Sequence, residues 1–423
     1  MKKVLIITYY WPPSGGAGVQ RWLKLSKFLP EHGWEPIILT VDPDYATYPV
    51  RDELLEKEVL PDTKVIKTKS REWFSAYKKI SGGKNVPYAG FASEDPKVTF
   101  KQKLARFIRG NFFIPDPRKG WNRFAYKVAF DLLSKEKINH IITTGPPQST
   151  HLIGLKLKKN LEHIHWIADF RDPWTDIYYY KDFYPTRIAH GINLQMEKRV
   201  LNKADMVLTV SPSWKKLFEQ KITHRTNKVR VLTNGYDPEN MADKVKSTSN
   251  KMIITYIGTM SDIYPFDGFI DAFSRFSSEN PDAILRFIGT ISTKQEKKIK
   301  SLPDQRYEII DYVPHAQAID YLFKSSVLLI IIPTHSSSDG IVPGKLFEYM
   351  AVGTPVIYLG PLSSDGASIV NRTKAGEAID ADDAESIYQT LRKWGDKLPD
   401  VSPAKAYSRK KLAGDLSSYL TNC

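Results

Sequence analysis

The chain has 423 residues, a length that predicts two domains of about 200 residues each. Hydrophobic residues make up 42% of the sequence and aromatic residues 12%, which indicates a folded chain and excludes a disordered one. The only cysteine is Cys423, so no disulfide can form within one chain. No apolar run approaches the roughly 20 residues that span a bilayer, and we expect a cytoplasmic protein.

The formal net charge is +14, and it is concentrated between Lys67 and Lys127, where fifteen Lys or Arg face four Asp or Glu. Aromatic residues are interleaved with these charges, and Lys101 to Arg109 is typical of a short basic amphipathic helix. Two interpretations stay open for residues 67–127. They form either a solvated basic surface or a rim that meets an anionic membrane or a lipid phosphate. No nucleic-acid-binding motif accompanies the charge, so we expect no nucleic-acid partner.

The first 41 residues predict a strand at Val4–Thr8, a helix at Gln20–Leu29 and a strand at Pro36–Val41. Strand, helix and strand within so few residues indicate a βαβ unit and therefore a parallel sheet. The alternation continues with strands at Lys64–Thr68, His140–Thr143, His163–Ala168, Met206–Val210 and Lys228–Leu232, and helices at Trp121–Lys135, Thr150–Lys159, His190–Lys203 and Ser213–Gln220.

A run of turn formers at Thr233–Asp237 and a polar stretch to Asn250 predict a linker. The alternation then restarts, with strands at Lys251–Ile257, Ala283–Ile288, Tyr307–Ile310, Val327–Ile332, Pro355–Leu359 and Ala375–Ile379, and helices at Phe266–Phe276, Lys294–Ser301, Ala316–Ser325, Gly344–Val352, Asp383–Trp394 and Ser402–Leu420. We therefore predict an α/β protein of two doubly wound, Rossmann-like parallel-sheet domains facing a central cleft. Their expected bounds are 1–237 and 251–400, with the tail 402–423 packing back on the first.

Two segments could each present backbone N–H groups to anionic oxygens. Ser14–Gly18 is glycine-rich and follows the first strand, while Pro343–Met350 opens a helix with Gly344 and Lys345 and places Glu348 one turn later. A helix N-terminus favours negative charge, and the lysine adds a cation. The pair of segments suits a nucleotide diphosphate.

The chain resembles the GT-B glycosyltransferases, specifically the retaining family 4, over nearly its whole length. The resemblance rests on the glycine-rich loop, on Asn234–Asp237, on a strand that ends Tyr256–Thr259, and most specifically on Pro343 through Ile357. Other segments are similar to a branch found in bacterial surface-polysaccharide clusters, namely Pro115–Arg118, Trp121, Gly145–Pro147 and Asp169–Trp174.

The resemblance implies that Glu348 holds the nucleotide ribose and that Gly344 and Lys345 hold the diphosphate, without a metal. The expected donor-binding residues are Gly16, Gly18, Gly258, Thr259, Asp339, Pro343, Gly344, Lys345, Leu346 and Glu348. Structural alternatives stay open for several of them: Lys345 as a surface lysine, Glu348 as a capping partner of its own helix, and the two first-domain glycines as a tight turn.

Three departures from the family pattern affect the predicted catalytic residues. Gly340 stands where many relatives have a first glutamate, and Asp339 is the neighbouring substitute. Residues 260–265 contain no basic residue, so Lys345 would carry more of the diphosphate charge. Arg171 stands where a histidine is common, so we expect Asp169 and Asp172 to orient the acceptor and Arg171 to bind its phosphate or carboxylate. A structural ion pair between Arg171 and Asp172 is the alternative.

The predicted function is transfer of a sugar from a UDP- or GDP-sugar to a saccharide or polyprenyl-diphosphate-linked acceptor, in surface polysaccharide or lipopolysaccharide synthesis. Such an enzyme would work in the cytoplasm or at the inner face of the plasma membrane. Three alternatives stay open: a weakly catalytic relic that binds glycans or partners, a nucleotide-sugar 2-epimerase, and a dinucleotide-dependent oxidoreductase. The nine histidines are scattered, and one cysteine excludes a thiolate zinc site, so we expect no metal or cofactor.

Overall fold

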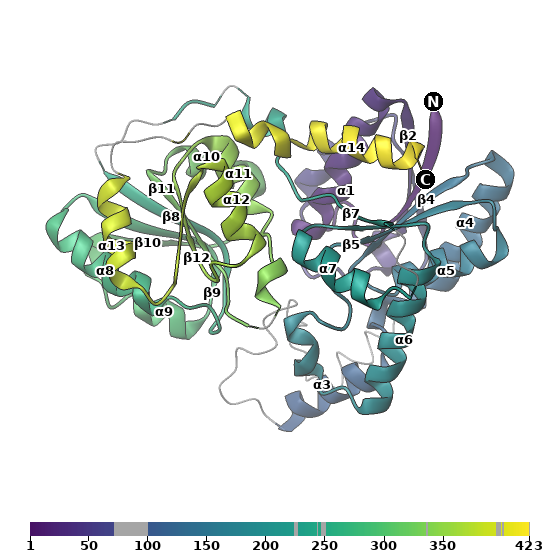
Figure 1. Ribbon diagram of the computed structural model, residues 1–423, viewed down its shortest axis with the longest axis horizontal. Coiled ribbons are helices and arrows are strands. Elements are labelled where there is room, and N and C mark those ends of the chain that lie inside the picture. The colour runs from purple at the N-terminus through teal and green to yellow at the C-terminus, as the bar shows by residue number, and fades with distance from the viewer. Residues whose placement is uncertain are drawn as a thin grey trace. The chain divides into compact units, whose positions relative to one another are not determined.

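The chain folds into two compact units, Met1–Thr233 with Leu412–Cys423 (unit 1) and Asn234–Lys411 (unit 2). The computed structural model describes residues 1–71, 100–223, 227–242, 244–246, 251–335, 337–394, 399 and 402–422. Each unit contains a parallel sheet covered by helices on both faces (Figure 1). No helix in these ranges is both long and apolar enough to cross a membrane.

The sheet of unit 1 has seven parallel strands among the residues described, in the order β3-β2-β1-β4-β5-β6-β7. The strands are β1 Lys2–Ile7, β2 Trp34–Val41, β3 Lys64–Thr68, β4 His140–Gly145, β5 His165–Phe170, β6 Met206–Thr209 and β7 Val229–Val231. Their apolar runs are buried on both sides, as a sheet covered by helices on both faces requires.

The helices of unit 1 lie on the two faces of its sheet, except α3, which packs against residues 178–183 and α6. They are α1 Ala17–Phe28, α3 Phe100–Phe112, α4 Asn122–Glu136, α5 Thr150–Asn160, α6 Arg187–Lys203, α7 Pro212–Lys221 and most of α14 Arg409–Thr421. Trp22 of α1 and Leu416 of α14 share one core with Ile6 of β1, although nearly 400 residues separate the helices in sequence. Figure 1 shows α1 and α14 beside each other on this face and α5 and α6 on the opposite one.

The sheet of unit 2 has six parallel strands in the described ranges, in the order β10-β9-β8-β11-β12-β13. The strands are β8 Met252–Met260, β9 Ala283–Ile291, β10 Tyr307–Ile310, β11 Val327–Ile331, β12 Val356–Leu359 and β13 Gly376–Ile379. The helices are α8 Asp267–Glu279, α9 Thr293–Ile299, α10 His315–Phe323, α11 Lys345–Val352, α12 Asp365–Thr373 and α13 Ala384–Lys393.

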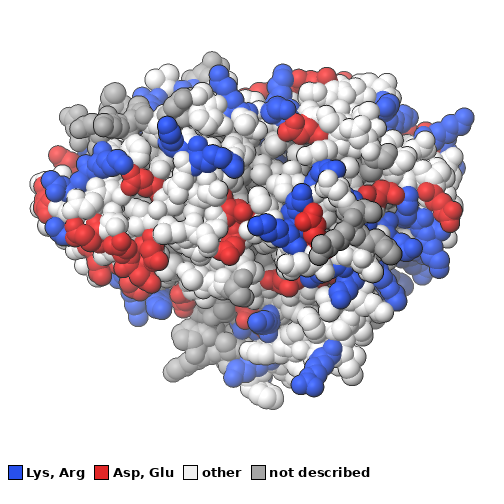
Figure 2. Space-filling view, viewed as in Figure 1, with Lys and Arg blue, Asp and Glu red and all other residues white. Residues whose placement is uncertain are grey.

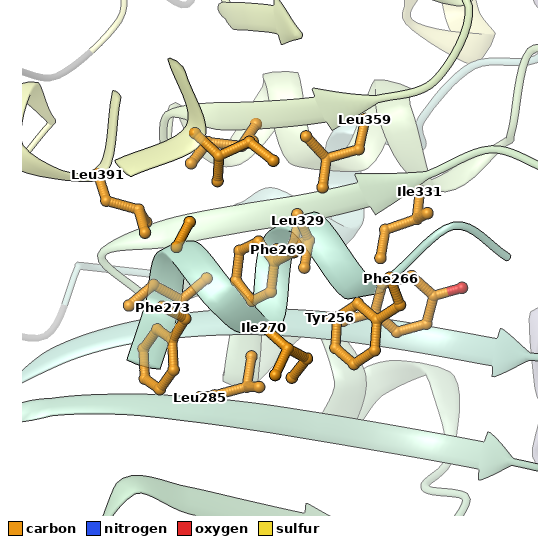
Figure 3. Close-up of a cluster of buried hydrophobic side chains, with 14 of the residues drawn as sticks. Tyr256, Phe266, Phe269, Ile270, Phe273, Leu285, Leu329, Ile331, Leu359 and Leu391 are labelled. Atoms are coloured by element: carbon orange, nitrogen blue, oxygen red, sulfur yellow. The ribbon is translucent and has the colours of Figure 1, made fainter. Parts of the chain in front are cut away.

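The core of unit 2 has two halves because successive residues of each strand point to opposite faces. Leu329 of β11 joins the cluster beneath α8 and α13, while Leu328 joins the cluster beneath α10, α11 and α12. Figure 3 shows α8 across the strands, with Phe269 and Phe273 directed toward the sheet. Each large apolar side chain buried in this way stabilises the unit by about 1.5–3 kcal/mol.

The strand order reverses beside one central strand in each unit, between β1 and β4 in unit 1 and between β8 and β11 in unit 2. Ligands of open α/β sheets bind outside the carboxyl ends of the strands at such a point. The loop Ser14–Gly18 follows β1, and the segment leading to Lys345 follows β11. The topology therefore places both predicted phosphate-binding segments at the edge where a ligand would be expected.

The predicted strands and helices are found in both units, and the two predicted strands Lys64–Thr68 and Tyr307–Ile310 have the observed bounds. The single helix predicted at Ser402–Leu420 is wrong. A 3-10 segment at Ser402–Tyr407 precedes α14, because the backbone at this point pairs with Tyr236. The Tyr236 N–H donates to the carbonyl of Tyr407 and the Tyr236 carbonyl accepts from the N–H of Arg409, at 3.2 and 2.7 Å. The Tyr407 carbonyl and the Arg409 N–H therefore pair with Tyr236 and not within a continuous helix.

The packing of α14 on unit 1 predicts that Leu416→Ala destabilises that unit. Leu416 is fully buried, so its truncation leaves a cavity and should lower the free energy of unfolding by about 2–5 kcal/mol. Urea unfolding followed by tryptophan fluorescence measures this, since eight of the nine tryptophans belong to unit 1. The exposed neighbour Ser418 gives the control Ser418→Ala, and equal midpoints for the two variants would contradict the assignment.

Candidate functional site

Lys345 is the first residue of α11, and its ammonium lies against the end of β8. The Nζ atom donates to the carbonyl of Ile257 at 3.0 Å and lies 3.8 Å from the ring centroid of Tyr256. Neither partner carries a formal charge. Within the described part of the chain, Lys345 forms no ion pair with a carboxylate. The cation is therefore held in place without being neutralised.

The surroundings of Lys345 make its positive charge costly in the free protein. Burial lowers the pKa of Lys345 from its usual value to about 7, because the half-buried ammonium loses hydration. An anion bound nearby would offset that loss and return the pKa toward its ordinary range. The geometry is suited to a ligand that brings negative charge.

Glu348 lies one turn after Lys345 and pairs with a residue from another element. Its Oε1 is 2.7 Å from Nε2 of His315, the first residue of α10, and both side chains are partly exposed. The N-cap of α11 is Gly344, whose end of the helix has no side-chain cap. Glu348 therefore does not cap its own helix in this structure. Its carboxylate contacts the imidazole of His315 instead.

The glycines near Lys345 differ in what the fold demands of them. Gly258 has φ of 135°, a conformation that favours glycine, and a Cβ there would lie 3.5 Å from the Lys345 ammonium. Gly344 has an ordinary φ of −56°, and a Cβ built on it would meet no atom within 4 Å. Nothing in unit 2 itself requires a glycine at position 344. Open space beside a helix N-terminus is what a closely approaching ligand would use.

The contacts of the other predicted donor residues say less about donor binding. Thr259 is in β8 and its carbonyl accepts from the Tyr256 hydroxyl at 2.7 Å, while Pro343 precedes the helix. The Leu346 side chain is fully buried in the core, so only its backbone is available to a ligand. Asp339 is exposed and accepts from Ser363 Oγ at 2.9 Å. The contacts of these residues with a donor stay predictions.

The sequence reasoning did not name His315. The available signal was its place just after β10, because the carboxyl ends of parallel strands meet at one edge of a sheet. Its pairing with Glu348 depends on how α10 and α11 pack, and no local pattern reports that.

In unit 1, Asp169 at the end of β5 is fully buried in a network of hydrogen bonds. Its carboxylate pairs with Arg21 of α1, with Nη2 at 2.8 Å, and accepts from Trp22 Nε1 at 2.8 Å and Thr144 Oγ1 at 2.9 Å. Burial alone would raise the pKa of Asp169, but the Arg21 guanidinium holds it below its usual value. This carboxylate ties α1 to the sheet, and its predicted role toward an acceptor stays a prediction.

Arg171 fastens the glycine-rich loop to the carboxyl edge of the sheet. Its guanidinium donates to three backbone carbonyls, those of Gly145 at 3.0 Å, Gly18 at 2.7 Å and Pro146 at 2.6 Å. A Cβ on Gly18 would lie 2.7 Å from Arg171 Nη1, and Gly16 has φ of 93°. The fold itself therefore accounts for a glycine at both positions. Their predicted contact with the donor is not tested by these observations and stays a prediction.

Asp172 follows Arg171 but does not pair with it. Among the described residues no ion pair joins the two side chains, and the guanidinium is directed to the backbone carbonyls instead. Burial raises the pKa of Asp172, while the nearby Arg171 charge acts in the opposite direction. The alternative of a structural ion pair is not seen, and Asp172 remains half-buried at the same edge as the glycine-rich loop.

The described residues contain no group of three or more His, Cys, Asp or Glu that could hold a metal ion. Unit 2 instead offers a lysine beside Gly258 and, one turn later on α11, a glutamate paired with a histidine. Such a set can bind anionic oxygens and hydroxyl groups through its side chains.

Two protein families match the chain. Residues 251–395 match the family Glycosyl transferases group 1, and residues 86–240 match Glycosyltransferase Family 4. The first match lies within unit 2 and contains Lys345, Glu348 and His315. The second contains Asp169 and Arg171. No curated protein matches the chain.

Several solved structures share the fold over the whole chain. Anabaena Alr3699/HepE in complex with UDP has a TM-score of 0.59 at 13% identity, covering 100% of both chains. Sucrose-phosphate synthase from Thermosynechococcus elongatus has a TM-score of 0.55 at 15% identity, covering 99% of this chain and 95% of the other. The lipopolysaccharide outer core galactosyltransferase WaaB, in its apo form, has a TM-score of 0.59 at 12% identity, covering 100% and 99%.

The two parallel sheets and these structural similarities define the fold as GT-B. One family match lies in each half of the chain, and each family is one of glycosyltransferases. The protein is therefore an enzyme, a glycosyltransferase of the GT-B fold.

The buried Asp169–Arg21 pair predicts a large effect of Asp169→Ala on stability. The substitution removes the ion-pair partner of the buried Arg21 guanidinium, which should lower the free energy of unfolding by about 3–5 kcal/mol. Urea unfolding of the variant measures the loss. Asp172→Ala, which breaks no ion pair, is the matched control. An Asp169→Ala protein as stable as this control, yet inactive, would favour the acceptor role over the structural one.

Proposed function

We propose that the protein is a retaining, metal-independent glycosyltransferase that uses a UDP- or GDP-sugar. Lys345 would bind the diphosphate and Glu348 the ribose hydroxyls, with the backbone of Gly344 and Gly258 close to the phosphates. The acceptor would be a saccharide, free or linked to polyprenyl diphosphate, in surface polysaccharide or lipopolysaccharide synthesis. The enzyme would work in the cytoplasm, at the inner face of the plasma membrane.

The observation that carries this proposal is the Lys345 ammonium, half-buried against uncharged partners at the start of α11. Transfer requires stabilisation of the diphosphate as its leaving oxygen gains charge. A fixed ammonium and a helix N-terminus supply that stabilisation without a metal ion. Glu348 can accept two hydrogen bonds from vicinal hydroxyls once its contact with His315 is exchanged for the ribose.

The structural neighbours support a nucleotide-sugar donor of this kind. HepE has been solved with UDP and with UDP-glucose, the latter at a TM-score of 0.56 and 12% identity over 100% of this chain and 97% of the other. WaaB is a galactosyltransferase of the lipopolysaccharide outer core. At such identities the likeness concerns the fold, so the base and the sugar have to be measured.

The acceptor proton can leave without a dedicated base in the proposed mechanism. The acceptor hydroxyl attacks the anomeric carbon of the donor sugar on the same face from which the diphosphate departs. The bond from that carbon to the diphosphate breaks, and the leaving phosphate oxygen takes the proton of the hydroxyl. Asp172 and Arg171 would then orient the acceptor through contacts at the carboxyl edge of unit 1. The absence of a histidine at position 171 does not disable this reaction.

A screen of UDP- and GDP-sugars, read out as released nucleotide, tests the proposal together with two variants. Lys345→Met should lower kcat by about 10²–10³, because the lost cation acts mainly on the leaving group. Glu348→Gln should raise the donor KM by about 10- to 100-fold, because hydrogen bonds to a charged group are worth roughly 1.5–3 kcal/mol. The variant Lys294→Met, at an exposed lysine of α9, is the control and should match the wild type.

Full activity in either site variant would contradict the donor assignment. Nucleotide binding without any release would favour the binding relic, and interconversion of sugar epimers would favour the epimerase. Preference for NAD over every nucleotide sugar would support the oxidoreductase alternative.

The lowered pKa of Lys345 predicts a pH dependence of UDP binding. The free site loses its proton near pH 7, whereas bound diphosphate stabilises the ammonium, so binding above pH 7 should take up a proton. Affinity should fall as pH rises from 7 to 9, by at most about tenfold per unit. Terminal phosphates ionise near pH 6 and contribute little in this range. Titration calorimetry in two buffers of different ionisation enthalpy measures the uptake.

Lys345→Met should abolish this proton uptake and flatten the dependence. An affinity that stays constant from pH 7 to 9 in the wild type would contradict a lysine that titrates against the diphosphate.

A further inference from the structure

Exposed apolar side chains gather on one part of unit 1. Of fifteen large hydrophobic side chains exposed among the described residues, seven belong to residues 100–112 and 184–192. Phe100 on α3 is 80% exposed and Ile188 on α6 is 77% exposed. Single exposed hydrophobic residues are ordinary, but a contiguous group marks an interaction surface.

On α3 the apolar side chains follow the spacing of one helix face. Phe100, Leu104 and Phe107 stand at i, i+4 and i+7, and all three point to solvent. Ala105 is the residue that α3 buries. This arrangement is the reverse of an ordinary surface helix, whose apolar stripe faces the core.

The C-terminal end of α3 is fixed beside the start of α6, so the two exposed groups belong to one surface. Asn111 donates from Nδ2 to the Tyr184 carbonyl at 3.0 Å and accepts at Oδ1 from the Thr186 N–H at 2.7 Å. The Arg109 guanidinium lies 4.2 Å from the ring centroid of Phe183. We name this surface, the exposed side chains of residues 100–112 and 184–192, the α3–α6 face.

The charge on this part of unit 1 is mainly positive. Residues 100–112 contain four Lys or Arg and no Asp or Glu, and residues 178–192 add two cations and a single acid, Asp182. At the end of the view where α3 lies, Figure 2 shows Lys and Arg side chains set among uncharged atoms. Residues 72–99 of the basic stretch noted in the sequence lie outside the described residues.

We propose that the α3–α6 face docks on the surface of an anionic lipid bilayer. The apolar side chains would enter the interface between headgroups and acyl chains, and the surrounding cations would pair with lipid phosphates. At 13 residues α3 is too short to cross a membrane and would lie in its plane. The surface would bring unit 1 to the lipid-linked acceptor of the proposed function, but its test does not depend on glycosyl transfer.

The positive charge of the α3–α6 face favours an anionic bilayer over a second copy of the chain as its partner. A two-fold dimer places the same patch on both partners, so the cations of one copy would face those of the other across the contact. An anionic bilayer complements both the charge and the apolar stripe.

Flotation of the full chain with vesicles tests the docking surface. One set contains phosphatidylcholine alone and the other contains 30% phosphatidylglycerol, each at 50 and 300 mM NaCl. The apolar variant carries Phe100→Ser, Leu104→Ser and Phe107→Ser, and the charge variant carries Lys101→Glu and Lys103→Glu. Each should lower partition onto the anionic vesicles by about tenfold or more. Both variants should retain the wild-type circular dichroism, because the altered side chains are exposed.

The control substitutions lie in unit 2. Leu362→Ser removes another exposed apolar side chain, and the double variant Lys294→Glu and Lys297→Glu removes two exposed cations of α9. Both should bind vesicles as the wild type does. Donor hydrolysis, assayed without vesicles, should be unchanged in every variant, which separates a failure of this inference from a failure of the donor site.

Three outcomes would overturn the docking surface. The first is no binding of the wild type to anionic vesicles at low salt, and the second is binding of the apolar variant equal to that of the wild type. The third is a loss of binding in the α9 charge variant as large as in the α3 charge variant, which would assign the binding to net charge alone. A wild-type dimer in light scattering that the apolar variant converts to monomer would assign the surface to self-association instead.

Discussion

Unit 2 contains one ammonium that the fold positions without neutralising, and the proposed donor site depends on it. Lys345 is held by a carbonyl at 3.0 Å and an aromatic ring at 3.8 Å, and burial brings its pKa to about 7. An arginine there would stay charged, and a lysine paired with a carboxylate would be of less use to a diphosphate. The open space at Gly344 and the left-handed backbone of Gly258 leave room for phosphate oxygens around this charge.

The charged residues of unit 1 are arranged differently. The Arg21–Asp169 pair is fully buried, and Arg171 is directed to three backbone carbonyls. These groups join α1, the glycine-rich loop and the ends of β4 and β5 into one edge. A rigid edge is what an enzyme needs in order to hold two reactants in a reactive geometry. The charged residues of unit 1 therefore hold its backbone in place, whereas the Lys345 ammonium of unit 2 pairs with no carboxylate among the described residues.

The sequence predicted the elements better than the contacts between them. Buried strands are near-continuous apolar runs, so both sheets could be recognised, and β3 and β10 have the predicted bounds. The break at Tyr407–Arg409 could not be seen because it depends on backbone pairing with Tyr236, more than 170 residues away in sequence. His315 was missed for the same reason, and the contacts of Arg171 with three backbone carbonyls could not be predicted either. Lys345 and Glu348 were predicted as donor-binding residues because glycine, lysine and glutamate at the start of a helix form a local pattern, and that role stays a prediction.

The central claim is that Lys345 and Glu348 hold the nucleotide diphosphate. A crystal structure of the chain with UDP tests it most directly. The account predicts a diphosphate oxygen within hydrogen-bond distance of Lys345 Nζ, and ribose hydroxyls on the Glu348 carboxylate in place of His315. A well-ordered UDP bound anywhere else, with Lys345 still on the Ile257 carbonyl and Glu348 still on His315, would contradict it.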